Sequence, residues 1–194
     1  MDYAKAYTQL HEENVKNFAG FVLRRYAPDI KRLVDLTKPR QLLDYGSGKG
    51  YQYLLQRAHE VWGGLLPYCY DVGVRQLKER PTIKFDGIIC TDMLEHIEET
   101  DMPGILDDAL SFLTDEDRPT FAFFAVSCRP SEGKFLPDGR NVHLTIQPPT
   151  WWRATLNAAR LRRNLPRLII SAGYEQSMED SGRVIRDEDI TRGN

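Results

Sequence analysis

Three glycines at alternate positions follow a short apolar run, and they restrict the possible fold more than any other feature of the chain. Residues 41–44 form the run and end in an acid, and Gly46, Gly48 and Gly50 come next. Glycine adopts positive φ angles and lets a ligand approach the backbone closely. The pattern therefore predicts a strand that turns sharply into a helix beside a ligand, with the unpaired N–H groups of the helix facing that ligand.

The spacing of the glycines distinguishes the chain from dinucleotide-binding enzymes. Gly50 comes one position too early for their Gly-x-Gly-x-x-Gly pattern. Asp44 would repel a pyrophosphate, whereas it suits a ligand with an ammonium group. The pattern Asp-x-Gly-x-Gly-x-Gly resembles the first motif of class I S-adenosylmethionine-dependent methyltransferases. This resemblance implies that Asp44, Gly46, Gly48 and Gly50 hold the methionine end of S-adenosylmethionine.

The composition is that of an ordinary globular protein. The 194 residues suit one domain, and the net charge of -2 argues neither for nor against a nucleic-acid partner. No apolar stretch reaches membrane-spanning length, and the first residues do not begin a signal peptide. Cys69, Cys90 and Cys128 lie far apart in apolar runs, which indicates reduced core thiols in a cytoplasmic protein without membrane association.

Strand and helix patterns alternate along the chain. Strands are expected at residues 41–44, 65–71, 85–92, 120–128 and 167–171. Helices are expected at residues 51–60, 94–113 and from 151 to Pro166, with two more in residues 3–36, interrupted near Gly20 and Pro28. This order predicts an α/β fold with a Rossmann-like, doubly wound and mainly parallel sheet. We expect N-terminal helices in residues 1–36 packed on the same domain, a core in 37–175 and a polar tail in 176–194.

A second acid, Asp71, ends the second predicted strand. In doubly wound folds, an acid at this place accepts hydrogen bonds from ribose hydroxyls. The resemblance to class I methyltransferases implies the same role here, and the alternative is a surface aspartate that caps the next turn. Only 14 positions separate Asp71 from Phe85, where the methyltransferase family usually fits a helix, a third strand and a loop. The region around this third strand is therefore shortened, and residues 81–84 leave room for a vestigial strand at best. Residues 74–80 could form two helical turns, and the adenine contact of the family cannot be assigned.

A third group of polar residues follows the strand predicted at residues 85–92. Asp92, Glu95 and His96 have i, i+3, i+4 spacing, and His143 comes after the strand predicted at residues 120–128, at the same edge of the sheet. Two carboxylates and two imidazoles suit a divalent ion such as Mg, Mn or Fe. The set resembles the metal site of RNA 3'-terminal 2'-O-methyltransferases and ubiquinone-biosynthesis O-methyltransferases, with Asp92 in place of the first glutamate. Asp92 is also expected beside the cofactor, and the alternative for the histidines is core packing.

These resemblances imply methyl transfer to a hydroxyl oxygen with help from a divalent metal, which would lower the pKa of the hydroxyl. Without a metal, His143 or His96 becomes the candidate general base, with Asp92 or Glu95 orienting the imidazole. Two alternatives stay open. The enzyme could methylate nitrogen or carbon without a metal, or the chain could be an inactive cofactor-binding subunit that works through a partner.

The acceptor itself is not identified by the sequence. Five arginines make residues 151–167 locally basic, but such a strip is more often a solvated helix face. We therefore expect a small or nucleotide-like acceptor in preference to a long nucleic acid, and the oligomeric state stays open. The loop that contains Arg140 and Asn141 is expected to face the acceptor. Tyr7 belongs either to an N-terminal lid or to an amphipathic core stripe.

Overall fold

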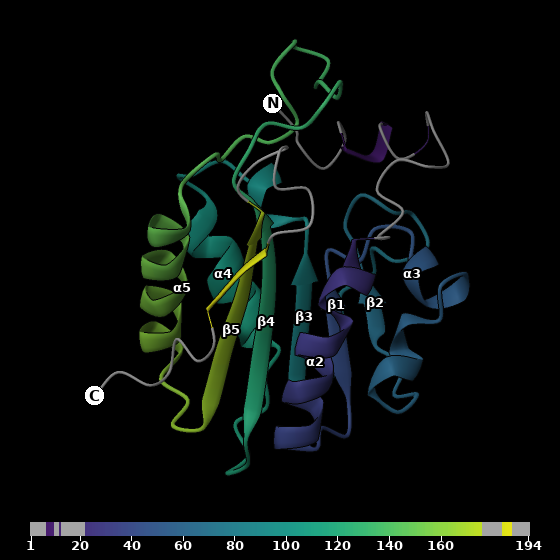
Figure 1. Ribbon diagram of the computed structural model, residues 1–194, viewed down its shortest axis with the longest axis vertical. Coiled ribbons are helices and arrows are strands. Elements are labelled where there is room, and N and C mark those ends of the chain that lie inside the picture. Colours follow the sequence, from purple (N-terminus) through teal and green to yellow (C-terminus); the bar gives the residue numbers. More distant parts are fainter. Residues whose placement is uncertain (1–6, 10–11, 13–21, 176–183, 188–194) are drawn as a thin grey trace.

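A six-stranded sheet forms the centre of the computed structural model, which describes residues 7–9, 12, 22–175 and 184–187. The strands are β1 (Leu42–Tyr45), β2 (Tyr68–Tyr70), β3 (Gly87–Thr91), β4 (Thr120–Ser127), β5 (Leu168–Glu175) and β6 (Val184–Asp187). Their order in the sheet is β2-β1-β3-β4-β5-β6. The first five are parallel, and β6 runs antiparallel to β5 (Figure 1). The predicted α/β fold with a mainly parallel sheet is confirmed.

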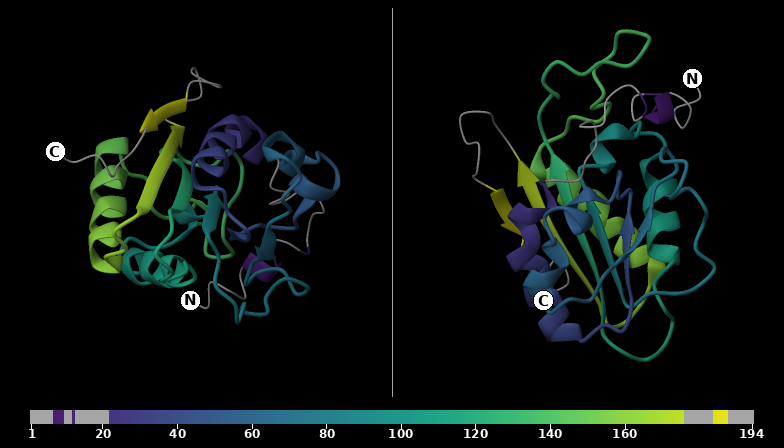
Figure 2. Two further views of the ribbon diagram at one scale, coloured as in Figure 1. Left: turned by 90° about the horizontal axis from the view of Figure 1, so that it is seen from below. Right: turned by 90° about the vertical axis from the view of Figure 1, so that its right-hand side faces the viewer.

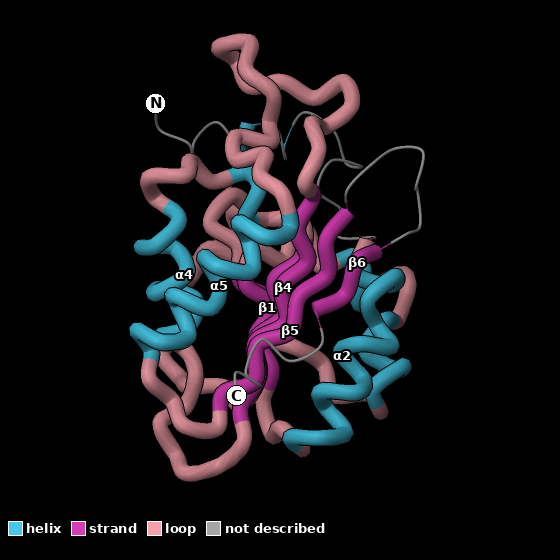
Figure 3. Tube along the Cα trace, turned by 60° about the vertical axis from the view of Figure 1, so that its left-hand side comes forward, coloured by secondary structure: helices cyan, strands magenta, loops and turns pink. Residues whose placement is uncertain are grey.

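Helices cover both faces of the sheet. Helix α2 (Leu23–Thr37) and the 3-10 helix η1 (Ala58–Trp62) lie on one face, and α4 (Met102–Ser111) and α5 (Pro149–Arg163) lie on the other (Figures 2 and 3). Successive strand residues point to opposite faces. Ile88 and Cys90 therefore pack with α4 and α5, whereas Ile89 between them packs with α2. This two-sided burial explains why the strands read as continuous apolar runs.

Helix α2 differs from the prediction because it continues through Pro28. Proline removes one helical hydrogen bond and normally interrupts a helix. Here Tyr26, Ile30 and Leu33 are almost fully buried on the sheet, and this packing keeps the helix continuous. The predicted interruption at Pro28 is wrong, and the one near Gly20 lies outside the described residues.

The helix after the glycine turn is much shorter than expected. Helix α3 covers only Tyr51–Leu54, whereas the sequence predicted residues 51–60. Arg57 has a φ of 51° in the left-handed region, so the chain leaves the helix there before η1 begins. A four-residue helix has a weak dipole, so α3 directs a weaker positive potential at the glycine turn than the predicted longer helix would.

The predicted shortening around the third strand is confirmed, because residues 72–86 contain neither helix nor strand. The chain turns directly after β2, with the N–H of Asp71 bonded to the carbonyl of Leu77 at 3.0 Å. The two helical turns suggested for residues 74–80 do not form. Arg80 instead holds this loop against α4 through an ion pair with Asp108 at 2.7 Å. Because no further strand pairs with β2 in the described part of the chain, β2 lies at one edge of the sheet and β6 at the other.

The helix expected over residues 94–113 is divided in two. The short 3-10 helix η2 (Leu94–His96) ends where Ile97 is extended, and α4 then begins at Met102 with Pro103 in its first turn. Residues 128–148 form a long loop above the carboxyl ends of the strands (Figure 1). In residues 176–194, β6 pairs with β5, and the rest of the expected tail lies outside the described residues. None of the described helices is long and apolar enough to cross a membrane.

Candidate active site

The glycine turn lies at the carboxyl end of β1 and has the predicted backbone conformation. Gly46, Gly48 and Gly50 have φ angles of 76°, 57° and 71°, which glycine adopts most readily. A Cβ at Gly46 would overlap the side chain of Met93, which follows β3. The turn after β1 and the segment after β3 are therefore in close contact at one edge of the sheet.

Asp44 is buried directly beneath this turn. Its Oδ2 atom accepts hydrogen bonds from Gln52 Nε2 at 2.9 Å and from the Tyr53 hydroxyl at 2.7 Å. Burial raises the pKa of Asp44 to about 6, and the negative charge of Asp71 acts in the same direction. Its Oδ1 atom is also buried but has no partner among the described residues. A buried oxygen without a partner is costly, so a donor on a bound ligand would satisfy this site.

Asp71 connects the end of β2 to the glycine turn. Its Oδ2 accepts a hydrogen bond from the N–H of Gly48 at 2.8 Å, and its Oδ1 accepts one from the N–H of Gly73 at 2.8 Å. An ionised carboxylate has about four lone-pair positions, so two backbone bonds leave capacity for a ribose. The capping alternative is thus observed at Gly73, and it is compatible with the predicted ribose contact.

The two acids after β3 lie in a desolvated region. Asp92 has a φ of 50°, which is unusual for a residue other than glycine and is often found at functional sites. Glu95 is fully buried, and its Oε1 accepts a hydrogen bond from the N–H of Ser127 at 3.0 Å. Its Oε2 has no partner among the described residues. Burial is the main cause that raises the pKa of both acids, and the charge of Asp92 further raises the pKa of Glu95.

The two histidines meet above the carboxyl ends of β3 and β4. Their ring centroids are 5.0 Å apart, in an edge-to-face arrangement. His96 Nδ1 lies 2.9 Å from the carbonyl of Val142, and His143 Nδ1 lies 2.6 Å from the carbonyl of Arg129. Carbonyl oxygens only accept hydrogen bonds, so each Nδ1 carries the proton and each Nε2 carries the lone pair. Burial lowers the pKa of His143, which keeps it neutral at pH 7.

The four predicted metal ligands do not converge. Among the described residues, no group of three or more His, Cys, Asp or Glu side chains could hold a metal ion. Glu95 accepts a hydrogen bond from the end of β4, whereas the ring of His96 in η2 meets the ring of His143 in the loop edge to face. The division of the expected helix at Ile97 explains this outcome, because i, i+3, i+4 spacing places three residues on one face only within a continuous helix. Backbone carbonyls, instead of Asp92 or Glu95, orient the two imidazoles.

The loop residues expected to contact the acceptor have structural partners. Arg140 forms ion pairs with Glu98 at 2.7 Å and with Asp138 at 2.8 Å. Asn141 bonds to the backbone of Ser131 through both its oxygen and its nitrogen. These bonds shape the loop that carries His143, so the two residues support the site from outside.

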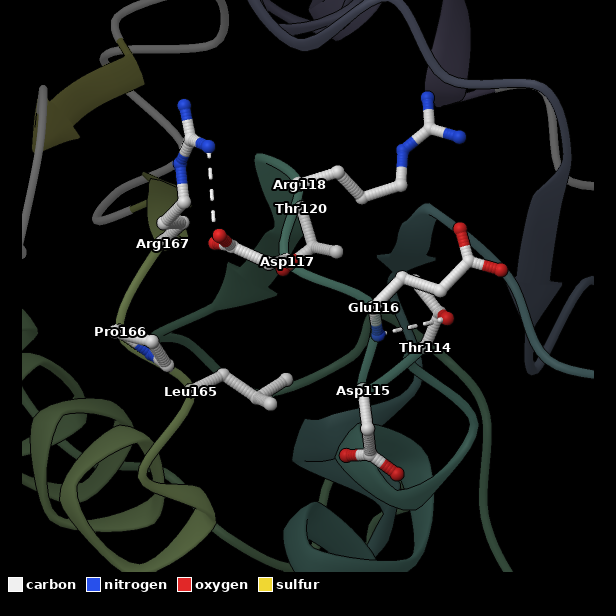
Figure 4. Close-up of a pocket in the computed structure, with 9 residues that line it drawn as sticks. All are labelled: Thr114, Asp115, Glu116, Asp117, Arg118, Thr120, Leu165, Pro166 and Arg167. Carbon is white, nitrogen blue, oxygen red and sulfur yellow. Dashed lines mark hydrogen bonds and ion pairs between the residues drawn. The ribbon is translucent and has the colours of Figure 1, made fainter.

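A small cavity lies at the opposite edge of the sheet. It has a volume of about 150 Å³ and is lined by residues 114–118, Thr120 and residues 165–167 (Figure 4). These residues precede β4 and β5, whereas the glycine turn follows β1 in the same parallel sheet. The cavity is therefore separated from the candidate site by the length of the strands.

An open, mainly parallel sheet with a glycine turn after its first strand and an acid after its second is typical of α/β proteins that bind a nucleotide-type cofactor. The family model of the methyltransferase domain matches residues 18–182, which is most of the chain, and the protein belongs to this family. Membership identifies it as a methyltransferase and implies S-adenosylmethionine as its cofactor. No curated protein matches the chain. The positive φ angles of the glycines and the unpartnered Oδ1 of Asp44 fit this cofactor.

Proposed function

We propose that this protein methylates a hydroxyl oxygen of a small or nucleotide-like acceptor, with His143 as the general base. The carrying observation is the hydrogen bond between His143 Nδ1 and the carbonyl of Arg129 at 2.6 Å. This bond fixes the tautomer that has a lone pair on Nε2. A hydroxyl is a poor nucleophile at neutral pH, so a neutral imidazole that removes its proton assists the transfer.

The lowered pKa of His143 supports this role. A base must be unprotonated when the acceptor binds, and burial disfavours the charged imidazolium of His143. The nearby positive charges of Arg129 and Lys134 act in the same direction. His143 is therefore ready to accept a proton throughout the neutral range, and the Arg129 carbonyl would stabilise the imidazolium that forms.

The cofactor would be held by Asp44 and by the turn from Gly46 to Gly50, with its ribose at Asp71. When bound, S-adenosylmethionine supplies an electrophilic methyl group on a sulfonium. The ammonium group at its methionine end suits the unpartnered Oδ1 of Asp44. Because Met93 contacts Gly46, the segment that leads to His96 lies against the cofactor turn. This contact brings the proposed acceptor side next to the proposed cofactor side.

Metal assistance is the second candidate. The Nε2 atoms of His96 and His143 are in the tautomeric state that binds divalent ions, and their rings are adjacent. The remaining ligands would have to come from the acceptor and from water, which occupy the open positions of catalytic metal sites. We rank this candidate second because the described side chains supply no third ligand.

A small acceptor is supported by the partners of the arginines on α5. On α5, Arg162 pairs with Asp107 at 2.8 Å, and Arg163 pairs with Asp115. Arg160 donates to Asn157 at 3.2 Å on the same helix. These three arginines bind side chains of the protein itself, which argues against a positively charged surface for a long nucleic acid.

A methyl-transfer screen tests the proposal. The protein is incubated with S-adenosylmethionine labelled in its methyl group, and with matched hydroxyl and amine compounds that include sugars, nucleotides and phenols. We expect label on hydroxyl acceptors and unchanged activity in EDTA. The rate of methyl transfer should fall about 100-fold or more in His143→Gln. Loss of activity in EDTA that returns with manganese would favour the metal candidate. Transfer only to amines would contradict the proposal, and no transfer to any acceptor would favour an inactive subunit.

A further inference from the structure

Tyr7 reaches the candidate site from far away in the sequence. Its hydroxyl lies 2.9 Å from the carbonyl of Val142, 3.2 Å from the carbonyl of His96 and 3.3 Å from His96 Nδ1. The two carbonyls belong to η2 and to the loop that carries His143. One hydroxyl therefore joins the N-terminal segment to both elements that supply the histidines.

The ring of Tyr7 is also fixed by packing. It packs, together with Leu144, against a small apolar cluster made by Leu136 and Val142. This cluster is separate from the two larger cores of the sheet, so it stabilises the loop above the strands. The amide of Leu144 donates to the carbonyl of Glu95 at 2.7 Å, which ties the same loop to η2 a second time.

The rings of Tyr7, His96 and His143 form a continuous series of edge-to-face contacts. The Tyr7 and His96 centroids are 5.3 Å apart with an interplanar angle of 80°, and the His96 and His143 centroids are 5.0 Å apart with an angle of 85°. Edge-to-face pairs of this kind are favourable and orient one ring against the next. The orientation of His96 thus depends on Tyr7, and the orientation of His143 depends on His96.

We propose that Tyr7 is a positioning residue for the base: its hydroxyl holds His96 in the Nδ1-protonated tautomer, and His96 holds the ring of His143 toward the acceptor. This inference rests on the proposed role of His143. Tyr7 donates its own proton to a carbonyl and accepts from His96 Nδ1–H, so the Nδ1 proton of His96 has two acceptors, Val142 and Tyr7. Tyr7 thereby becomes part of the acceptor site.

Nuclear magnetic resonance of the histidine rings tests the positioning without any acceptor. The chain has four histidines, so ¹⁵N-labelled rings can be assigned by substitution. In Tyr7→Phe the packing ring remains and only the hydroxyl is lost. We expect the Nδ1-protonated to Nε2-protonated ratio of His96 to fall about fivefold, the equivalent of one neutral hydrogen bond. The matched control is Tyr68→Phe, at a half-exposed tyrosine on the edge strand, and it should leave the ratio unchanged.

A second measurement connects the tautomer to turnover. With an acceptor found by screening, Tyr7→Phe should lower kcat about fivefold and leave the affinity for S-adenosylhomocysteine within twofold. Tyr7→Ala also removes the packing ring and should lower kcat further. An unchanged His96 ratio in Tyr7→Phe overturns the inference, as does an altered ratio with normal kcat. If His143→Gln retains activity while the His96 ratio still shifts, the proposed base fails, and the hydrogen bond from His96 to Tyr7 stands as a structural feature.

Discussion

The carboxylate of Asp71 accepts a hydrogen bond from the N–H of Gly48 at 2.8 Å, so the acid that ends β2 holds the middle glycine of the turn that follows β1. A second bond from Gly73 at 2.8 Å fixes the same carboxylate from the other side. Asp71 therefore shapes the proposed cofactor turn and also lies where a ribose would bind. These two roles predict that its replacement weakens cofactor binding more than it weakens folding.

Asp71→Asn tests this relationship. An amide keeps the size of the side chain but loses its charge and one of its two acceptor oxygens. We expect the affinity for S-adenosylhomocysteine to fall about 10-fold or more, the size of a hydrogen bond to a charged group. Calorimetry measures the affinity, and Asp117→Asn at an exposed side chain is the matched control. Equal affinities of the two variants would remove Asp71 from the cofactor site.

The glycines of the turn should differ in their tolerance of alanine. Gly46→Ala combines a positive φ with overlap onto Met93 and should cost about 2–4 kcal/mol of unfolding free energy. Gly50→Ala meets only Cys69 Sγ at 3.5 Å and should cost about 1–2 kcal/mol, which reflects its backbone angle. Gly139→Ala, with a φ of 84° and open space around its Cβ, measures the backbone cost alone. Urea denaturation gives the three values, and equal costs at Gly46 and Gly139 would contradict the close contact with Met93.

Cofactor affinity should rise with pH as Asp44 ionises. The pKa of Asp44 is raised to about 6, so its carboxyl is mostly neutral at pH 5 and mostly charged at pH 7. Only the charged form attracts the ammonium group of the ligand. The dissociation constant of S-adenosylhomocysteine should therefore fall between pH 5 and pH 7 in the wild type. The Asp44→Asn variant should show a flat profile over this range, and a parallel profile in the two proteins would exclude an ammonium contact at Asp44.

Two neighbouring arginines of α5 should contribute unequally to stability. Arg163 donates to the carbonyls of Leu110 and Leu113, so Arg163→Gln removes two partly buried hydrogen bonds and should cost about 1–2 kcal/mol. Arg162 forms an exposed pair with Asp107, so Arg162→Gln should cost less than about 1 kcal/mol. Thermal unfolding compares the two. Neither change should alter methyl transfer to a small acceptor, whereas a joint loss of activity would indicate a longer, charged acceptor.

The sequence predicts most of the sheet because its signals are local. The apolar run into Asp44 and the three glycines predict β1 and its turn, and the aromatic run from Thr120 predicts β4 to within one residue. The short distance from Asp71 to Phe85 leaves room for a vestigial strand at best, which is why the shortened region could also be foreseen. These features depend on spacing and burial along a few consecutive residues.

The errors occur where distant contacts decide the structure. Helix α3 ends early, and its residues Gln52 and Tyr53 donate hydrogen bonds to the buried Asp44. The spacing of apolar residues in the sequence does not predict these contacts. Pro28 stays inside α2 because the sheet holds that helix from one side. Strand β6 lies in the tail expected to be polar, and only Val184 and Ile185 of the strand are apolar, a run too short to predict its pairing with β5.

The candidate site was predicted in part. The sequence placed His96 and His143 at the same edge of the sheet, and their rings are indeed adjacent. It could not show that backbone carbonyls of Val142 and Arg129 orient them, because a carbonyl has no signature in the sequence. For Tyr7, the sequence suggests only a place in an N-terminal lid or in an amphipathic core stripe. Its contact spans 89 positions along the chain, and apolar periodicity does not encode such a contact.

Binding of S-adenosylhomocysteine is the most direct test of the central claim, that this chain is a methyltransferase whose cofactor lies over the turn from Gly46 to Gly50. Titration calorimetry of the wild type should show one site per chain and no comparable binding of NAD. Gly48→Val should abolish the signal, because a branched side chain at a φ of 57° distorts the turn. Tight binding of NAD without binding of S-adenosylhomocysteine, or undiminished binding in Gly48→Val, would contradict the account.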